Sequence, residues 1–298
     1  KGYYTNFIII VWRTMTRFIV KMDMSEDKIL FQKYLCDKDA INRYPFIKNS
    51  IFRIFPDLKE KLESENREAK QLMIINHFVE SMYGMNKNKI IQIKENLEHK
   101  IDNFSDVICE NISKMMSFDF GNDAMYEIHL SLLPFSTYGK NKARISILDD
   151  IWWHRNTPFI GIIIHELSHV ILQEQFDKRK IKTSPFNFNV LKEIFAPILL
   201  RRDPFKEMIQ SEELLKGNPE VYYLQIKKND KKWSIIDYFE EIYLWEMENG
   251  KQFSEIMEKL LYILESNEEI LKEKKNIFNM IHQWEYMWSP EFKEKLES

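Results

Sequence analysis

The residues best suited to chemistry are the five from His165 to His169, which read His-Glu-Leu-Ser-His. On a helix, positions i and i+4 lie on one face, one turn apart, so both imidazoles can reach one tetrahedral Zn²⁺. Glu166 follows the first histidine, and its carboxylate can reach a water on the metal without binding the metal itself. The spacing predicts a zinc site with His165 and His169 as ligands and Glu166 as general base.

The surroundings of this motif are apolar. Glu166 is the only charged residue between positions 156 and 173. A helix of this composition is buried, and its two histidines and one glutamate need partners, because burying polar groups unpaired costs several kcal/mol. A metal ion is one such partner. The alternative is a core helix whose histidines are satisfied by neighbouring side chains.

A catalytic zinc needs a third protein ligand and an open position. Glu174 lies on the same helix, five residues after His169, and is rotated off the ligand face. Glu193 lies 24 residues after His169 in an apolar segment, which leaves room for a loop and a returning helix. We predict Glu193 as the third ligand, because a buried carboxylate needs a partner.

The pattern His165-Glu166-x-x-His169 followed by Glu193 resembles the gluzincin group, the thermolysin-like zinc metallopeptidases. The resemblance covers roughly residues 125–200 and implies zinc-dependent hydrolysis of peptide bonds, with the three residues as ligands and Glu166 as base. The chain departs from the group at Pro197, where the larger gluzincins often carry an acidic residue that orients a ligand histidine. The longer pattern with a third histidine is excluded, because Leu172 and Gln175 stand at its glycine and histidine positions.

In the expected mechanism, zinc lowers the pKa of its bound water from about 15.7 toward about 7, and Glu166 takes the proton and passes it to the leaving amine. The tetrahedral oxyanion usually needs a second donor besides the metal. The candidates are His154, Tyr222, Tyr223 and His282, and Tyr223 is the residue we predict.

Three other functions stay open. One is a zinc hydrolase or amidase that acts on a non-peptide substrate. Another is a regulatory metallopeptidase that cleaves repressors, since Phe195-Ala196 and Leu199-Leu200 resemble residue pairs of such enzymes, although at a shorter offset from Glu193. The last is an inactive zinc-binding protein, against which Glu166 argues, because a structural site needs no spare carboxylate.

Composition narrows the partners. The chain has 298 residues, 44% of them hydrophobic, and a net charge of −3, which gives no electrostatic case for nucleic acid. The apolar run at 7–12 is too short to cross a bilayer, so we expect no membrane span. Two cysteines make no disulfide framework and favour a reducing, cytoplasmic location. We therefore expect a peptide or protein substrate.

The elements around the motif predict an α+β fold, mostly α-helical, with a zincin-like core whose small sheet lies beside the motif helix. We expect a mainly helical region at 1–120 and a zincin-like domain at 121–298 with a helical C-terminal part, and the two can form one continuous domain. Strands are predicted at 6–12, 17–22, 125–133 and 143–148, and the last is expected to be an exposed edge strand that pairs with substrate. Helices are predicted from Ser25, at 57–81 ending near Gly84, and at 86–116, 158–177, 190–200, 204–216, 233–248, 251–265 and 267–288.

Overall fold

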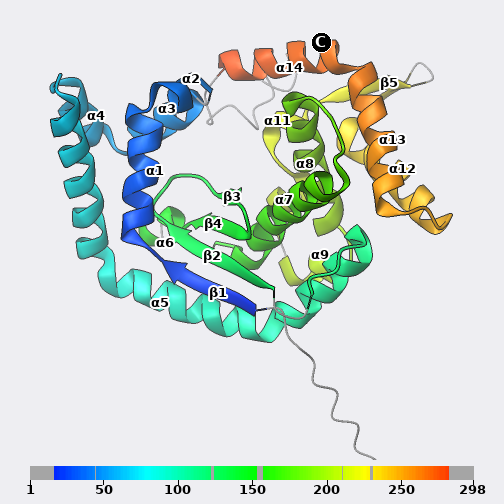
Figure 1. The fold of residues 1–298 in the computed structure, drawn as a ribbon, viewed down its shortest axis with the longest axis horizontal. Coiled ribbons are helices and arrows are strands. Elements are labelled where there is room, and N and C mark those ends of the chain that lie inside the picture. Colours follow the sequence, from blue (N-terminus) through cyan, green and yellow to red (C-terminus); the bar gives the residue numbers. More distant parts are fainter. Residues whose placement is uncertain are drawn as a thin grey trace, which may run out of the picture.

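The part of the chain that surrounds the predicted site is mostly helical, with a small mixed sheet (Figure 1). The computed structural model describes residues 17–43, 45–121, 124–152, 157–209, 211–228 and 231–281. The α+β, mostly helical class is confirmed. The predicted strand at 6–12 lies outside the described residues, as do His154 and His282.

The main sheet has four strands in the order β1-β2-β4-β3. Strands β1, β2 and β4 run parallel, and β3 is antiparallel to β4 at the edge. Parallel strands covered on both faces consist largely of apolar residues, and Ile128, Ala143 and Ile145 are fully buried here. The strands are β1 (Arg17–Met22), β2 (Met125–Ser131), β3 (Thr137–Gly139) and β4 (Lys142–Ser146).

The prediction that 143–148 is an exposed edge strand is wrong. β4 pairs with β2 on one side and with β3 on the other, so β3, a strand that was not predicted, lies at the edge instead. The cause is a tight turn in which Asn141 takes a positive φ of 53°. Asparagine tolerates this conformation, and the turn folds Thr137–Gly139 back onto β4.

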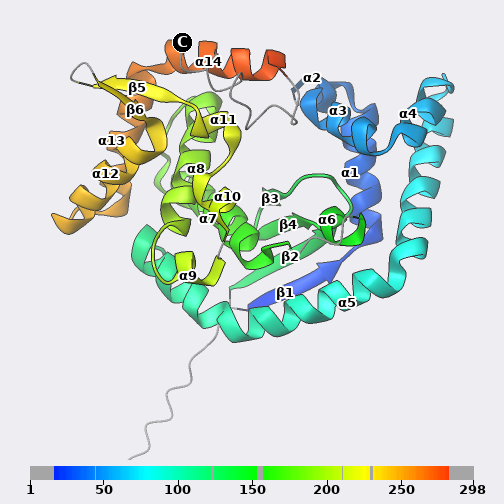
Figure 2. The same ribbon diagram turned by 180° about the vertical axis from the view of Figure 1, so that it is seen from behind.

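After β1, the described part of the N-terminal region forms five helices, of which the last is by far the longest. α5 runs beneath the sheet and contacts α1, β1 and α7 (Figures 1 and 2). The predicted break at Gly84 is wrong, because α5 continues through this residue and the helix breaks instead between Glu63 and Glu68. One glycine costs a helix only about 1 kcal/mol, and buried residues such as Val79 and Ile90 hold α5 on both sides of it. The helices are α1 (Met24–Cys36), α2 (Lys38–Arg43), α3 (Pro45–Ile54), α4 (Pro56–Glu63) and α5 (Glu68–Met116).

Asp27 fastens α1 to the sheet and to α5. Its carboxylate is buried and accepts hydrogen bonds from Tyr83 Oη at 2.9 Å, Ser131 Oγ at 2.5 Å and the Leu132 amide at 2.8 Å. The N-cap of α1 is Asp23 and not Ser25, since the Asp23 side chain accepts from the first free amides of the helix. The N-terminal helices are thus held against the same sheet that borders the predicted site.

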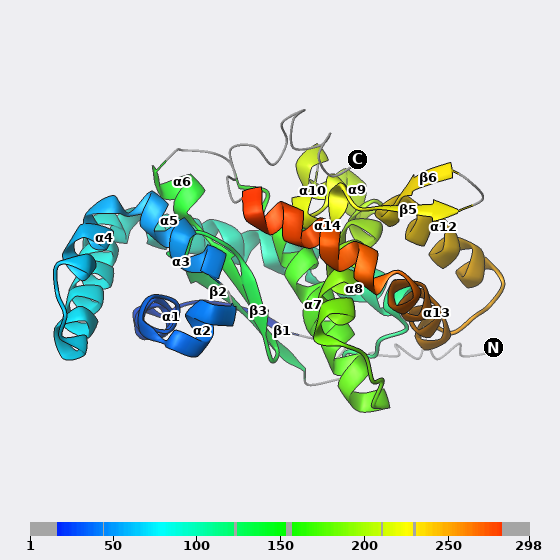
Figure 3. The same cartoon turned by 90° about the horizontal axis from the view of Figure 1, so that it is seen from above.

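The second half of the chain carries the predicted site on its first two long helices. α7 packs against β3, β4 and α8, and α8 lies between α7 and the helices α12 and α13 (Figure 3). A hairpin, β5 and β6, follows α11 and was not expected from the sequence. Ser184 caps α8, so this helix begins at Pro185 and not at the predicted position 190. The elements are α6 (Leu148–Trp152), α7 (Phe159–Arg179), α8 (Pro185–Leu200), α9 (Phe205–Ile209), α10 (Glu212–Lys216), α11 (Pro219–Tyr222), β5 (Gln225–Lys228), β6 (Lys231–Ser234), α12 (Ile235–Glu248), α13 (Phe253–Ser266) and α14 (Glu268–Ile281).

The sheet and the helices share one hydrophobic core, to which β1, α5, α7 and α8 all contribute. None of the helices in the described ranges combines the length and the apolarity that crossing a bilayer would require.

Candidate metal centre

The His-Glu-Leu-Ser-His motif lies in the middle of α7, as the spacing predicts. One helical turn separates His165 from His169, and their ring centroids are 4.5 Å apart. The helix packs closely at its start, where a Cβ on Gly161 would lie 2.6 Å from Leu214 Cδ1 and 2.9 Å from Ile209 Cγ2. This packing against α9 and α10 fixes the helix that presents both imidazoles.

Glu193 reaches the two histidines from α8. Its Oε2 lies 3.5 Å from His165 Nε2, and its Oε1 lies 3.4 Å from His169 Nε2. One candidate ligand atom from each of the three residues lies within 4.8 Å of the other two. Among the described residues, this is the one group of three or more histidine, cysteine or acidic side chains close enough to share a metal ion. The structure therefore brings together the three residues predicted as ligands.

His169 tests whether these residues fit a metal. Its side chain is only 2% exposed, and neither ring nitrogen has a hydrogen-bond partner among the described residues. Buried polar atoms are nearly always paired, so each exception needs an explanation. A metal at Nε2 explains one of the two, and the donor set of two imidazoles and one carboxylate suits zinc. The residues present thus fit the metal predicted from the sequence.

Metal binding needs neutral imidazoles and a charged carboxylate. The pKa shifts of His169 and Glu193 in the metal-free chain favour these forms, whereas the shift of His165 goes in the opposite direction. Burial, together with the charge of Lys192, lowers the pKa of His169 to about 3. Burial alone would lower the pKa of His165, but the carboxylates of Glu193 and Glu166 raise it overall. Burial would raise the pKa of Glu193, but Lys192 and the two imidazoles hold it well below its ordinary value.

Glu166 differs from Glu193 in its ionisation. Burial raises the pKa of Glu166 to about 7, although the charges of His165 and Lys192 act in the opposite direction. The two carboxyl groups of one small site are therefore driven apart in pKa. Such a separation is typical of sites in which one carboxylate binds and the other exchanges protons.

Two further residues hold the Glu193 carboxylate. Lys192 Nζ donates to Oε1 at 2.7 Å, and Asn218 Nδ2 donates to Oε2 at 3.4 Å. Asn218 is held close because Pro197 packs against the turn before it, where a Cβ on Gly217 would lie 2.8 Å from Pro197 Cγ. The proline at the position of the expected acidic residue thus supports an asparagine that contacts Glu193, the predicted third ligand.

Sequence reasoning missed Lys192 as part of the site. A signal was present, since Lys192 and Glu193 are the only charged residues of α8. Its Nζ also lies 4.9 Å from the ring centroid of Tyr138, whose ring packs at 5.2 Å against that of His169. Tyr138 belongs to β3, so the edge of the sheet borders the candidate metal centre directly.

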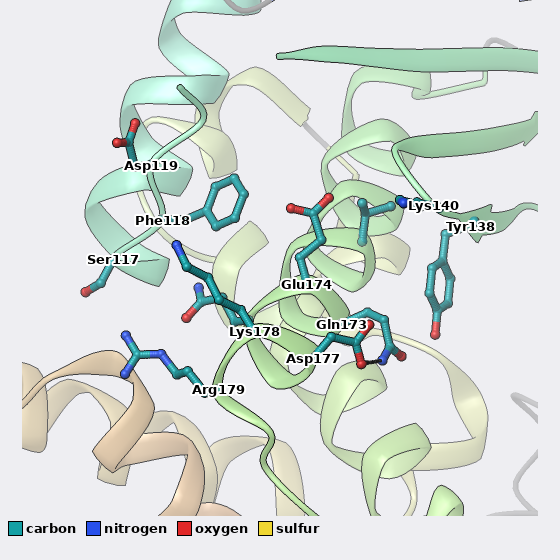
Figure 4. Close-up of a pocket in the computed structure, with 13 residues that line it drawn as sticks. Ser117, Phe118, Asp119, Tyr138, Lys140, Gln173, Glu174, Asp177, Lys178 and Arg179 are labelled. Carbon is teal, nitrogen blue, oxygen red and sulfur yellow. Dashed lines mark hydrogen bonds between the residues drawn. The ribbon is translucent and has the colours of Figure 1, made fainter. Parts of the chain in front are cut away.

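Glu174, the rejected alternative ligand, lies outside the metal group. It lines a pocket of about 1020 Å³ between the end of α5, the β3–β4 turn and the second half of α7 (Figure 4). Tyr138 and Lys140 lie on one side of this pocket, and Arg179 lies on the opposite side. The pocket and the metal group share Tyr138 as a common wall.

Tyr223 is buried just after α11, and its ring centroid lies 5.1 Å from that of Tyr222. Its predicted role as oxyanion donor stays a prediction.

Comparisons with known proteins add no information about this site. No family model matches the chain, and no curated protein or solved structure was found to be similar to it.

Proposed function

We propose that this chain is a zinc-dependent peptidase, with His165, His169 and Glu193 as metal ligands and Glu166 as general base. The proposal rests mainly on the position of Glu193, whose carboxylate oxygens lie within 3.5 Å of Nε2 of both histidines. Glu193 was predicted as the third ligand from the sequence alone, because of its distance from the motif and its apolar neighbours. The buried ring nitrogens of His169, neither of which makes a hydrogen bond among the described residues, support the same assignment.

A bound Zn²⁺ would supply the acidification of a water molecule and the polarisation of a carbonyl group. The protein's own residues prepare for this. The two imidazoles and the Glu193 carboxylate would hold the metal from three sides. Glu166 can take up and release a proton near neutral pH, since its pKa is about 7. A base works best when its pKa lies near the working pH.

The open edge of β3 supports a peptide substrate over a small amide. β3 pairs with β4 on one side, and no described strand pairs with its other side. An extended peptide can add to such an edge through backbone hydrogen bonds, and Tyr138 places this edge against His169. A sheet edge, a motif helix and a glutamate helix are also what the gluzincin resemblance implies, and we propose a zincin-like core on that basis.

We further propose a protein or peptide partner and no nucleic acid partner, given the net charge of −3. The two cysteines favour a cytoplasmic location.

The test is hydrolysis of an unfolded protein by the zinc-loaded chain. Denatured casein is incubated with wild type and with Glu166→Gln, and new termini are identified by mass spectrometry. We expect cleavage by wild type, abolished by EDTA, and a loss of at least about 10²-fold in Glu166→Gln with zinc content unchanged. Equal cleavage by both proteins would contradict the proposal. Zinc binding with hydrolysis of simple acyl amides but of no peptide would favour the amidase alternative.

A further inference from the structure

Lys192 is the one cationic side chain that the described structure places in contact with the metal group. Lys192 directly precedes Glu193 on α8, and neighbouring side chains on a helix leave its axis about 100° apart. Even so, both side chains turn to the same site and are only 12% and 14% exposed. Lysine is almost never buried unless it is paired.

Pairing with Glu193 does not by itself account for a lysine here. When a divalent cation binds the carboxylate, the ammonium stays close to a second positive charge, and like charges in a buried site repel strongly. Asn218 already contacts Glu193 without adding charge, and methionine would fill the volume of Lys192 without this repulsion. A fixed ammonium at this place therefore fits a site that receives a further negative charge.

Tyr138 holds that ammonium on the substrate side. Its ring faces Lys192 Nζ at 4.9 Å and packs against His169 at 5.2 Å. The ammonium thus lies between the open edge strand β3 and the ligand group. This is the space in which an extended substrate on β3 would place its reacting carbonyl.

We propose that Lys192 binds an anionic oxygen of the substrate, with Tyr138 holding it in position. This inference rests on the proposed peptidase function. The oxygen has two possible sources: the carbonyl oxygen that becomes negative when it is attacked, or the C-terminal carboxylate of the peptide. In the first case Lys192 takes the role that the sequence suggested for Tyr223.

The test uses the full chain and three variants: Lys192→Met, Lys192→Arg and the control Lys61→Met, which removes an exposed lysine of α4. Zinc stoichiometry is measured first. The Co²⁺-loaded proteins are then titrated with acetate, followed by visible absorption. We expect Lys192→Met to keep the metal and to bind acetate at least about tenfold more weakly, the usual loss for one charge-assisted hydrogen bond. Lys192→Arg and Lys61→Met should stay close to wild type.

Kinetics separate the two sources, with one cleaved peptide prepared with a free and with an amidated C-terminus. If the oxygen is that of the attacked carbonyl, Lys192→Met loses about 10²–10³-fold in kcat on both peptides with KM unchanged. If it is the terminal carboxylate, KM rises for the free acid alone.

Acetate binding and kinetics equal to wild type in Lys192→Met would overturn the inference while the proposed function stands. Loss of zinc from Lys192→Met would also overturn it, because Lys192 would then only position Glu193. Failure of wild type to bind any metal would overturn the proposed function itself, and the inference with it.

Discussion

Replacing Glu166 by glutamine should stabilise the metal-free protein at neutral and alkaline pH while it removes hydrolysis. Glu166 is 6% exposed, and burial raises its pKa from an ordinary 4.5 to about 7. The charged form is therefore costly in the folded chain. Glutamine has nearly the same shape and carries no charge at any pH, so the variant avoids this cost.

The sign and size follow from proton linkage. A carboxyl group whose folded pKa is raised binds its proton more tightly in the folded state. Its contribution to stability is therefore complete below pH 4.5 and is lost as pH rises toward about 7. A change of this size in pKa corresponds to about 3 kcal/mol. The free energy of unfolding of Glu166→Gln should thus exceed that of wild type by an amount that grows to about 3 kcal/mol above pH 7.

The assay is urea unfolding in EDTA, from about pH 5 to about pH 8, a range that spans the titration of the buried group. The matched control is Glu95→Gln, which removes an exposed carboxylate of α5 and should follow wild type at every pH. Only the difference between wild type and variant is interpreted, because other groups titrate in the same range. Parallel pH profiles for wild type and Glu166→Gln would refute the reasoning, since Glu166 would then not be a buried carboxyl group poised to exchange protons.

Three other outcomes are expected. His169→Ala should lose zinc, so that EDTA lowers the melting temperature of wild type and leaves that of the variant unchanged; an equal response of both proteins would place the metal elsewhere. Asp27→Ala should lower the free energy of unfolding by about 3 kcal/mol or more, because it leaves the Leu132 amide and the Tyr83 hydroxyl buried without their acceptor. Asp27→Asn keeps an acceptor and should lower the free energy of unfolding by only about 1 kcal/mol. Equal losses for the two variants in urea unfolding would count against these hydrogen bonds. Tyr138→Phe should bind zinc like wild type, since the ring contacts remain, while Tyr138→Ala should bind it more weakly in a chelator competition.

The proximity of the three candidate ligands was predictable from the sequence. The i, i+4 spacing of His165 and His169 places both rings on one side of any helix, so their proximity follows from helical geometry alone. Glu193 was predictable because a carboxylate in an apolar helix needs a partner. Lys192 is the other charged residue of this apolar helix, so the same need for a partner would have predicted that it belongs to the site.

The predictions that were wrong or missing concern features that depend on contacts between segments distant in the sequence. The strand at 142–146 has the composition of a strand, but whether it lies at an edge depends on the turn at Asn141 that folds β3 onto it. Gly84 has the weakest helix propensity after proline, and the packing of α5 overrides it. The contact of Asn218 with Glu193 depends on Pro197 meeting Gly217, residues that no local pattern connects.

The central claim is that His165, His169 and Glu193 bind one zinc ion, and its most direct test is X-ray absorption at the zinc edge. The full chain is loaded with one equivalent of Zn²⁺ and compared with Glu193→Gln and His169→Ala. The account predicts two imidazole nitrogens at about 2.0–2.1 Å and carboxylate oxygen at about 2.0–2.2 Å in wild type, with one imidazole fewer in His169→Ala. A sulfur neighbour at about 2.3 Å, or a wild-type spectrum that neither substitution changes, would contradict it.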